Sequence, residues 1–321
     1  MTTENLQQKL WERHRSTLGI ENPLIIDNEQ ALFDTQTRLN LAQSTITTNR
    51  QGLTLSLAKA ALVYLPKSKP LIDMTLALVS GMVEKDGKIL LVGGNDAGIR
   101  SANELFEKNI GPIDQKIVGN HSAMYVGKNQ ALGAGKTLSD FLSYQNVTYG
   151  TTNIEVANLP GVFSGGKLDA GTRLLLDTIP YDKKKILDIG CGSGMIGVIY
   201  KNKSPESDVT MCDVNPIAIE ATKKTVEKNK IEAKVFISDV FSNVTGEYDL
   251  ILCNPPFHKG VGTDYSFIEI FARDARKHLT KDGKMYVVCN SFLAYEKKLE
   301  LAGLSVSVAV DNTSFKVLLA H

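Results

Sequence analysis

Two short segments in the second half of the chain combine residue types that could bind and orient a small polar ligand. The first is Asp188, followed after Ile189 by Gly190-Cys-Gly-Ser-Gly194. Glycines let the backbone turn sharply and approach a ligand with no Cβ in the way. Asp188 could accept hydrogen bonds from a ligand ammonium group or from the N–H groups of the loop. A GxGxG turn by itself occurs in many nucleotide-binding loops, so the surrounding residues have to indicate the ligand.

Acidic residues at the ends of the next two apolar runs help to identify the ligand of this loop. Asp213 lies where a doubly wound sheet places an acid that accepts from both ribose hydroxyls. Asp239 could accept from an adenine amino group while Val240 or Phe241 packs on the ring, or it could be an ordinary helix cap or turn residue. NAD would favour a GxGxxG turn, and Asp188 would repel its phosphates. A sulfonium cofactor with a zwitterionic methionine end fits better.

The second segment, Asn254-Pro-Pro-Phe257 with His258, follows the apolar run that ends at Cys253. An exocyclic amine is a poor nucleophile because its lone pair is delocalised. The Asn254 side-chain carbonyl and the Pro255 backbone carbonyl could accept its two hydrogens and turn the lone pair toward a methyl donor. Phe257 offers a flat face for a planar target, and His258 is expected to make a polar contact or accept the proton. Such catalysis works mainly by proximity and alignment.

The elements that must position these residues alternate between strands and helices, which indicates a mostly parallel sheet covered on both faces. A closing hairpin is expected around Asn312 and Thr313. The predicted strands are 185–189, 209–213, 235–238, 248–253 and 284–288, the predicted helices are 195–200, 216–228 and 267–279, and the predicted hairpin strands are 304–310 and 314–320.

The first half of the chain echoes the second. Lys85-Asp-Gly-Lys88 and the apolar run after it parallel Lys281-Asp-Gly-Lys284 and its run, which suggests an internal repeat rather than a chance similarity. The first copy has no glycine loop after its strand at 24–27, and it has Tyr64-Leu-Pro-Lys67 in place of Asn254-Pro-Pro-Phe257. We therefore predict a degenerate domain over 1–145 and a working domain over 150–321, joined near 139–152.

Bulk properties exclude several classes of protein. The chain has 321 residues, 43% hydrophobic residues and a net charge of +1, so we expect a globular cytoplasmic protein whose overall charge does not favour nucleic acid. Local clusters such as Lys67 with Lys69 would have to supply any RNA contact. No apolar run is long enough to span a bilayer. The four cysteines lack metal-ligand spacing, so we expect buried thiols and no metal site.

The chain resembles the ribosomal RNA small subunit methyltransferase C family, whose members methylate guanine N2 in 16S rRNA. The resemblance extends over nearly the whole chain, although the first thirty residues match poorly and 165–167 form a different loop. It rests on Leu159-Pro-Gly-Val-Phe-Ser164, Leu168-Asp-Ala-Gly171, Asp188-Ile-Gly-Cys-Gly192, Cys212-Asp213, Asn254-Pro-Pro-Phe-His258, Asn290-Ser-Phe-Leu293 and Ser314-Phe-Lys-Val317, with Leu65-Pro-Lys-Ser-Lys-Pro70 and Gly98-Ile-Arg-Ser-Ala102 in the first half.

The resemblance implies two tandem Rossmann-like class I methyltransferase domains. Each would be a mostly parallel seven-stranded sheet with a C-terminal antiparallel hairpin, the first would be degenerate, and S-adenosylmethionine would bind the second. The expected cofactor-binding residues are Asp169, Gly171, Asp188, Gly190, Cys191, Gly192, Gly194, Asp213, Val214, Asp239, Val240 and Asn254. Asn254, Pro255 and Phe257 would hold the reacting guanine, and His258, Lys67 and Lys69 would add substrate contacts.

The expected partner is ribosomal RNA or the small ribosomal subunit, with no membrane and no metal. Other activities remain open at this point. The related large-subunit guanine-N2 enzymes share most of the C-terminal motifs. Enzymes that methylate a protein glutamine usually have tyrosine where Phe257 stands, and an adenine-N6 methyltransferase is a further alternative. A non-catalytic RNA-binding assembly factor would not need the intact glycine loop and Asn254-Pro-Pro-Phe257.

Overall fold

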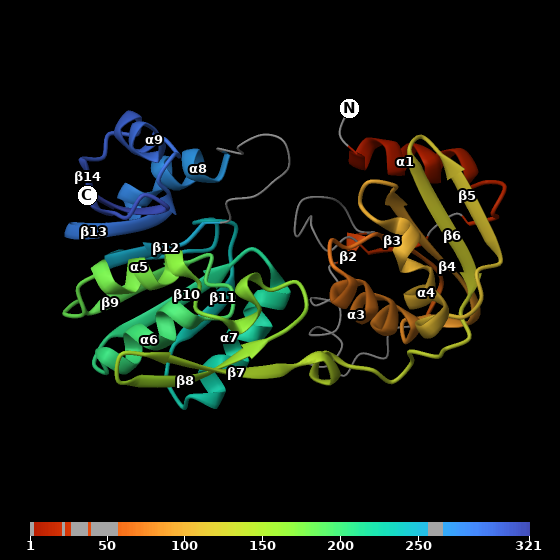
Figure 1. The fold of residues 1–321 in the computed structure, drawn as a ribbon, viewed down its shortest axis with the longest axis horizontal. Coiled ribbons are helices and arrows are strands. Elements are labelled where there is room, and N and C mark those ends of the chain that lie inside the picture. Colours follow the sequence, from red (N-terminus) through yellow and green to blue (C-terminus); the bar gives the residue numbers. More distant parts are fainter. Residues whose placement is uncertain (1–2, 21–22, 27–37, 40–56, 256–265) are drawn as a thin grey trace. The chain divides into compact units, whose positions relative to one another are not determined.

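The computed structural model describes residues 3–20, 23–26, 38–39, 57–255 and 266–321. The chain divides into two compact units, 1–142 and 143–321. Figure 1 colours the N-terminal unit from red to yellow-green and the C-terminal unit from yellow-green to blue.

The C-terminal unit is built on a seven-stranded sheet in the order β11-β10-β9-β12-β13-β15-β14 (Figure 1). The first five of these strands run parallel, and β15 is antiparallel to both β13 and β14. The strands are β9 (Lys185–Ile189), β10 (Asp208–Asp213), β11 (Lys234–Ile237), β12 (Tyr248–Cys253), β13 (Leu279–Asn290), β14 (Val306–Asp311) and β15 (Phe315–Ala320). The helices are α5 (Ala170–Thr178), α6 (Met195–Lys203), α7 (Pro216–Lys228), α8 (Ser266–Ala275) and α9 (Tyr295–Leu301), with 3-10 turns η3 (Phe163–Gly166) and η4 (Arg276–His278).

The central strands are apolar at nearly every position because both faces of the sheet are covered. Successive side chains of a strand point to opposite faces. Leu187 and Ile189 of β9 therefore join one core with α8 and α9, while Ile186 joins the other core with α5, α6 and α7. This arrangement confirms the predicted α/β architecture and leaves the loops at the carboxyl ends of the strands to form a site.

A separate two-stranded hairpin, β7 (Ser143–Tyr149) with β8 (Thr152–Asn158), opens the C-terminal unit. It packs on α7, where Asn229 exchanges hydrogen bonds with the Glu155 backbone at 2.8 and 3.0 Å. Thr225 Oγ1 also accepts from Ala157 N–H at 3.0 Å. The stretch expected to join two domains is thus largely an ordered part of the second.

The N-terminal unit has a sheet in the order β2-β1-β3-β4-β6-β5. Seven strands were predicted for each half, and this half has six among the residues that the structure describes. The strands are β1 (Leu24–Ile26), β2 (Arg38–Leu39), β3 (Ala58–Tyr64), β4 (Val83–Gly94), β5 (Gln115–Gly119) and β6 (Ser122–Lys128). The helices are α1 (Thr3–His14), α3 (Lys69–Ser80) and α4 (Asn103–Asn109), with 3-10 turns η1 (Ile99–Ala102) and η2 (Leu138–Phe141). Helix α1 places Leu10 and Trp11 in a core against the sheet.

The two sheets share one topology, with β2-β1-β3-β4-β6-β5 corresponding to β10-β9-β12-β13-β15-β14. They also share an irregularity, since β4 and β13 each advance five residues where the paired strand advances two. The register pairs that define it are Ala58↔Val83 and Ala60↔Lys88 in the first sheet, and Tyr248↔Leu279 and Leu250↔Lys284 in the second. A bulge repeated at the same place in the same topology agrees with the predicted internal repeat.

Glycine is required in both bulges. A Cβ on Gly87 would lie 2.8 Å from the Lys59 carbonyl oxygen, and a Cβ on Gly283 would lie 2.8 Å from the Tyr248 carbonyl oxygen. The Asp-Gly pair that recurs in each half of the sequence is therefore explained by close backbone approach.

The strand registers also show which residues correspond between the units. Ile25 occupies the position in β1 that Asp188 occupies in β9, and Tyr64 occupies the position at the end of β3 where Asn254 follows β12. An apolar side chain replaces the carboxylate, and a phenol replaces the amide. The N-terminal unit therefore keeps the fold but lacks these two acceptors.

These replacements predict one cofactor molecule per chain, bound in the C-terminal unit. Calorimetric titration with S-adenosylhomocysteine should give a stoichiometry of one. Asp213→Ala should weaken that single binding event by about 1–3 kcal/mol, because the ribose hydroxyls lose a charged acceptor. Two binding events per chain would contradict the prediction, and so would one event that Asp213→Ala leaves unchanged.

Candidate functional site

The glycine loop connects β9 to α6 at the carboxyl edge of the C-terminal sheet. Gly190, Gly192 and Gly194 adopt φ values of +70°, +57° and +81°, which side chains with a Cβ rarely adopt. A Cβ on Gly194 would lie 2.8 Å from Thr222 Cγ2, so this glycine permits close packing of α6 on α7. A Cβ on Gly190 or Gly192 would meet nothing within 4 Å. Open space therefore lies beside the part of the loop expected to approach a ligand.

Hydrogen bonds hold this loop against β10. Gly190 N–H and Cys191 N–H both donate to the Cys212 carbonyl oxygen, at 2.8 and 3.0 Å. The Cys191 side chain is buried beside Thr222 Oγ1, 3.4 Å away, and burial raises the pKa of its thiol well above the usual value. Cys191 contributes its backbone to the loop, and its thiol is a buried, unreactive side chain that packs against α7. All four cysteines are buried free thiols, as predicted.

Asp213 is the last residue of β10 and is anchored by the same loop. Its Oδ2 accepts from Gly192 N–H at 2.9 Å, and its Oδ1 accepts from Asn215 N–H at 2.8 Å. Burial raises the pKa of Asp213, and these backbone hydrogen bonds oppose that shift. Each carboxylate oxygen keeps a second lone pair, so the half-buried side chain can still accept from two neighbouring hydroxyls. The next residue, Val214, is 40% exposed, which is unusual for an apolar side chain beside a buried strand.

Asp188, near the end of β9, is fully buried. Its Oδ2 accepts from Gly197 N–H in α6 at 3.1 Å, while its Oδ1 has no hydrogen-bond partner among the described residues. Burial, with a smaller contribution from the charge of Asp213, raises the pKa of Asp188 to about 7. A buried acceptor without a donor is uncommon in a folded protein. It fits a site that an external donor, such as a ligand ammonium group, completes.

Asn254 follows β12, which is paired with β9 in the sheet. Its Nδ2 donates to Thr172 Oγ1 in α5 at 2.8 Å. Its Oδ1 is buried and, like Asp188 Oδ1, lacks a partner among the described residues. Pro255 is buried beside it. The structure thus brings the two predicted acceptors to the ends of adjacent strands. Phe257 and His258 lie outside the described residues.

Asp169 and Gly171 lie at the start of α5. Asp169 caps the helix by accepting from Thr172 N–H at 3.0 Å. A Cβ on Gly171 would lie 3.3 Å from the Phe315 ring, so this glycine lets β15 pack against the helix. Both residues therefore have structural roles, and a direct contact with the cofactor remains a prediction.

Asp239 and Val240 follow β11. Their turn is held by Ser238 Oγ, which donates to the Val240 carbonyl oxygen at 2.9 Å. The half-buried Asp239 carboxylate accepts no hydrogen bond within the described part of the chain, so it is not a helix cap. Val240 is buried with φ +48°. Phe241, the alternative ring contact, stacks on His278 with centroids 4.8 Å apart and belongs to the same core cluster as Val240, so the choice between the two stays a prediction.

Lys67 and Lys69 lie in the N-terminal unit, so the C-terminal site described above does not include them. Both are exposed at the carboxyl end of β3, the strand that corresponds to β12. Lys69 begins α3, with Ser68 before it as the cap residue.

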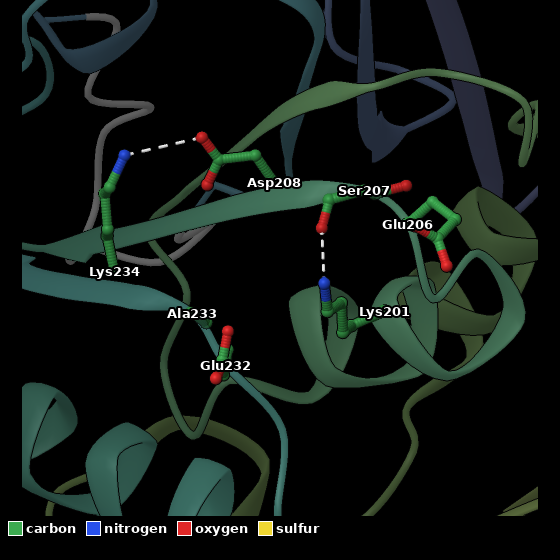
Figure 2. A pocket seen from close by; sticks show the side chains of 7 residues that line it. All are labelled: Lys201, Glu206, Ser207, Asp208, Glu232, Ala233 and Lys234. Atoms are coloured by element: carbon green, nitrogen blue, oxygen red, sulfur yellow. Dashed lines mark hydrogen bonds and ion pairs between the residues drawn. The ribbon is translucent and has the colours of Figure 1, made fainter.

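A hollow of about 410 Å³ lies elsewhere in the C-terminal unit (Figure 2). Its residues come from the end of α6 and the starts of β10 and β11, so it is at the opposite edge of the sheet from the glycine loop. Both of its lysines already have partners. Lys234 Nζ lies 3.4 Å from Asp208 Oδ2, and Lys201 Nζ donates to the Ser207 carbonyl oxygen at 2.6 Å. This hollow offers no arrangement of groups for the predicted chemistry.

Thr172 is the site residue that the sequence analysis missed. It is 5% exposed and lies between Asp169 and Asn254. The spacing Asp169-x-x-Thr172 before an apolar run is a helix-start pattern, and it could have predicted the cap. It could not have predicted the contact with Asn254, which is 82 positions away.

Among the described residues, no group of three potential ligands is placed to hold a metal ion. Within that same part of the chain, no helix has the length and apolar character needed to cross a membrane.

The raised pKa of Asp188 predicts a pH-dependent stability. Between about pH 4 and about pH 7, the folded protein holds a proton on Asp188 that the unfolded chain has released. The contribution of this group to stability therefore falls as pH rises through that window. Above about pH 7, burial of the ionised Asp188 carboxylate lowers the free energy of unfolding by its full amount, on the order of 4 kcal/mol.

Asp188→Asn removes the titrating group, so its free energy of unfolding should decline less between about pH 5 and about pH 8 than that of the wild type. Denaturant unfolding of the ligand-free protein measures this difference. The exposed Asp182→Asn is the matched control and should follow the wild-type profile. Parallel profiles for Asp188→Asn and the wild type would contradict the burial argument.

Comparison with known families agrees with the division into two units. Residues 153–319 match the family described as "Methyltransferase small domain", and residues 11–144 match "Methyltransferase small domain N-terminal". Among solved structures, a 16S rRNA N2 methyltransferase of T. thermophilus, in complex with AdoMet and guanosine, is similar with a TM-score of 0.73. It is 22% identical, and the match covers 83% of this chain and 73% of that one. At this identity, the likeness shows the shared fold.

Curated relatives are closer in sequence. The Ribosomal RNA small subunit methyltransferase C of Vibrio parahaemolyticus is 37% identical over 76% of this chain and 72% of its own length. The protein of the same name from Psychromonas ingrahamii is 35% identical over 88% of this chain and 80% of its own. The chain belongs to the ribosomal RNA small subunit methyltransferase C family.

Proposed function

We propose that this protein transfers a methyl group from S-adenosylmethionine to the exocyclic N2 of a guanine in 16S ribosomal RNA, acting in the cytoplasm on the RNA or on the small ribosomal subunit. The observation that carries the proposal is the Oδ1 of Asn254 at the end of β12, which is buried and has no partner among the described residues. It lies on the strand beside Asp188 and the glycine loop. The names of the curated relatives and of the T. thermophilus enzyme support the choice of 16S rRNA and of guanine.

The residues around the glycine loop suit the cofactor. Asp188 Oδ1 would accept from the amino group of its methionine end, which would supply the donor that this buried oxygen lacks among the described residues. Asp213 would accept from the ribose hydroxyls, and Asp239 from the adenine amino group. Val214, which is exposed, and Val240, which is buried, would pack on the adenine ring. When bound, S-adenosylmethionine supplies a positively charged, already activated methyl donor.

The residues after β12 suit the amine. Asn254 Oδ1 would accept one hydrogen of the N2 amino group, and the Pro255 carbonyl oxygen would accept the other. These two acceptors hold the lone pair toward the methyl donor, so orientation provides the catalysis. No strong base is needed during the attack, because the proton leaves the nitrogen afterwards. Phe257 would stack on the guanine, and His258 would contact the base or receive the proton.

The N-terminal unit would dock RNA and stabilise the enzyme. Among its described residues it keeps six paired strands, but it has Ile25 and Tyr64 in place of the two acceptors. Its exposed Lys67 and Lys69 lie at the edge that corresponds to the reactive edge of the C-terminal unit. Phosphate contacts of this kind supply affinity without sequence specificity.

The central experiment follows tritiated methyl transfer from S-adenosylmethionine to naked 16S rRNA, small subunits, large subunits and release factors. Labelled products are identified by mass spectrometry. N2-methylguanosine in 16S rRNA is the expected product. N6-methyladenosine, methylglutamine or label in the large subunit would identify a different enzyme, and absence of transfer to every substrate would indicate an assembly factor.

The same assay tests the residues. Asn254→Ala should lower the single-turnover rate about 100-fold, because its hydrogen bond aligns the amine. Phe257→Ala should instead weaken substrate binding by about 1–3 kcal/mol, because the base loses its stacking partner. Phe257→Tyr keeps the flat face and should retain most activity. Full activity of Asn254→Ala would overturn the assignment of the reactive site.

Charge reversal tests the docking role. Lys67→Glu with Lys69→Glu should raise the apparent Kd for RNA and lower the slope of its salt dependence by about 1 for each phosphate that a lysine no longer neutralises. Affinity for S-adenosylhomocysteine should be unchanged. Lys184→Glu with Lys185→Glu is the charge-matched control, since both lysines are exposed at the opposite edge of the C-terminal sheet. Equal effects of the two double variants would reduce the docking role to a general charge effect.

A further inference from the structure

Two residues at the start of α5 and one that follows β12 form a hydrogen-bonded chain. Asn254 Nδ2 lies 2.8 Å from Thr172 Oγ1, and Thr172 Oγ1 lies 2.6 Å from Asp169 Oδ2. The other oxygen of Asp169 accepts from Thr172 N–H at 3.0 Å. The carboxylate is therefore fixed at the start of α5 by two bonds to one residue, and the Thr172 hydroxyl is fixed between it and the amide.

The chemistry of these groups sets the direction of the chain. A carboxylate accepts hydrogen bonds and has no proton to donate, so the single proton of the Thr172 hydroxyl goes to Asp169. The Thr172 oxygen then presents a lone pair to Asn254. The group of Asn254 that faces it must donate, which requires the amide nitrogen rather than the amide oxygen. The orientation of the amide follows from the network and not from the shape of the side chain.

This direction decides which atom of Asn254 faces away from α5. With Nδ2 held by Thr172, Oδ1 is the free end of the amide, and it is buried without a donor among the described residues. An amide turned the other way would present hydrogens where the reaction needs an acceptor. Such a flip would repel the N–H groups of an incoming amine.

We propose that Thr172 and Asp169 are positioning residues that keep the Asn254 carbonyl oxygen, rather than its amino group, directed at the reacting amine. This inference rests on the proposed function of Asn254. It also gives Asp169 a task other than a direct contact with the cofactor.

The packing around Thr172 supports a positioning role. Thr172 is 5% exposed, and its neighbour Gly171 lies against the Phe315 ring of β15. Helix α5 contributes Leu175 and Leu176 to the core beneath it. The hydroxyl thus has little freedom to turn elsewhere, so it can hold the amide in one orientation through many turnovers.

Three substitutions test the individual hydrogen bonds between Asp169, Thr172 and Asn254. Thr172→Val removes the hydroxyl at nearly constant volume, and Thr172→Ser keeps the hydroxyl. Asp169→Asn can still cap the helix with its amide oxygen, but its amide nitrogen would face the Thr172 hydroxyl. The hydroxyl would then donate to Asn254, which reverses the chain and turns Oδ1 away from the substrate.

Single-turnover methylation of 16S rRNA at saturating cofactor should fall about 10- to 100-fold in Thr172→Val and in Asp169→Asn. The KM for RNA and the affinity for S-adenosylhomocysteine should stay at wild-type values. Thr172→Ser should restore most of the rate. The double variant Thr172→Val with Asp169→Asn should be no slower than either single variant, because both substitutions disrupt the same hydrogen-bond network.

A matched control comes from the other end of the same helix. Thr178 Oγ1 donates to the Leu174 carbonyl oxygen at 2.7 Å and takes no part in the chain. Thr178→Val should therefore turn over like the wild type. If it slowed methylation as much as Thr172→Val, the effect would belong to helix α5 in general, and the proposal would fail.

The outcomes also distinguish this inference from the proposed function. Wild-type turnover of Thr172→Val, combined with a slow Asn254→Ala, would overturn the positioning pair and leave the reactive site intact. A fast Asn254→Ala would overturn the site itself. Loss of cofactor affinity in Asp169→Asn, with no matching loss of turnover in Thr172→Val, would assign Asp169 to the cofactor and end the proposal.

Discussion

The C-terminal site depends on burying acceptor oxygens that the described part of the chain does not satisfy. Asp188 Oδ1 and Asn254 Oδ1 lie at the ends of neighbouring strands without a donor among the described residues. Each such atom costs about 1–3 kcal/mol when it leaves water unpaired. The cost is tolerated because β9 and β12 are central strands, paired on both sides and covered on both faces. A ligand that donates to these oxygens removes the cost, so affinity and orientation come from the same atoms.

The N-terminal unit has the same fold without the buried acceptor oxygens of the C-terminal site. Its strand order and its bulge match those of the C-terminal unit, down to a glycine that close backbone approach requires in each. At the positions that correspond to Asp188 and Asn254, it has Ile25 and Tyr64. Backbone pairing is thus kept where it supports the sheet, while buried acceptors without partners are replaced. This pattern is expected for a unit that serves as a scaffold or docking surface.

Local signals in the sequence predicted the elements around the site well. Helix α7 begins and ends where predicted, because Asn215 caps it and Pro216 is suited to its first position. Strand β12 also has its predicted bounds, because its apolar run is interrupted by the Asn-Pro pair that follows. The carboxylates of the loops were likewise placed correctly at the ends of β9, β10 and β11.

Long-range contacts account for what the sequence did not predict. The β7–β8 hairpin has a polar, mostly exposed first strand, and it depends on contacts with α7 that no local pattern encodes. The bond between Thr172 and Asn254 is of the same kind. The packing of Phe241 on Phe271 and His278 is a further contact between residues far apart in the sequence, and its contact with the adenine ring stays a prediction.

Strand β15 has a consequence for the order of events during synthesis. It is made after every other strand of its sheet, yet it lies inside that sheet, between β13 and β14. Its first residue, Phe315, packs against Gly171 at the start of α5. Domains fold as units while the chain leaves the ribosome, so the N-terminal unit can be complete while the C-terminal sheet still lacks an inner strand. The C-terminal sheet, with the glycine loop at its carboxyl edge, can therefore be completed only once residues 315–320 have emerged and joined it.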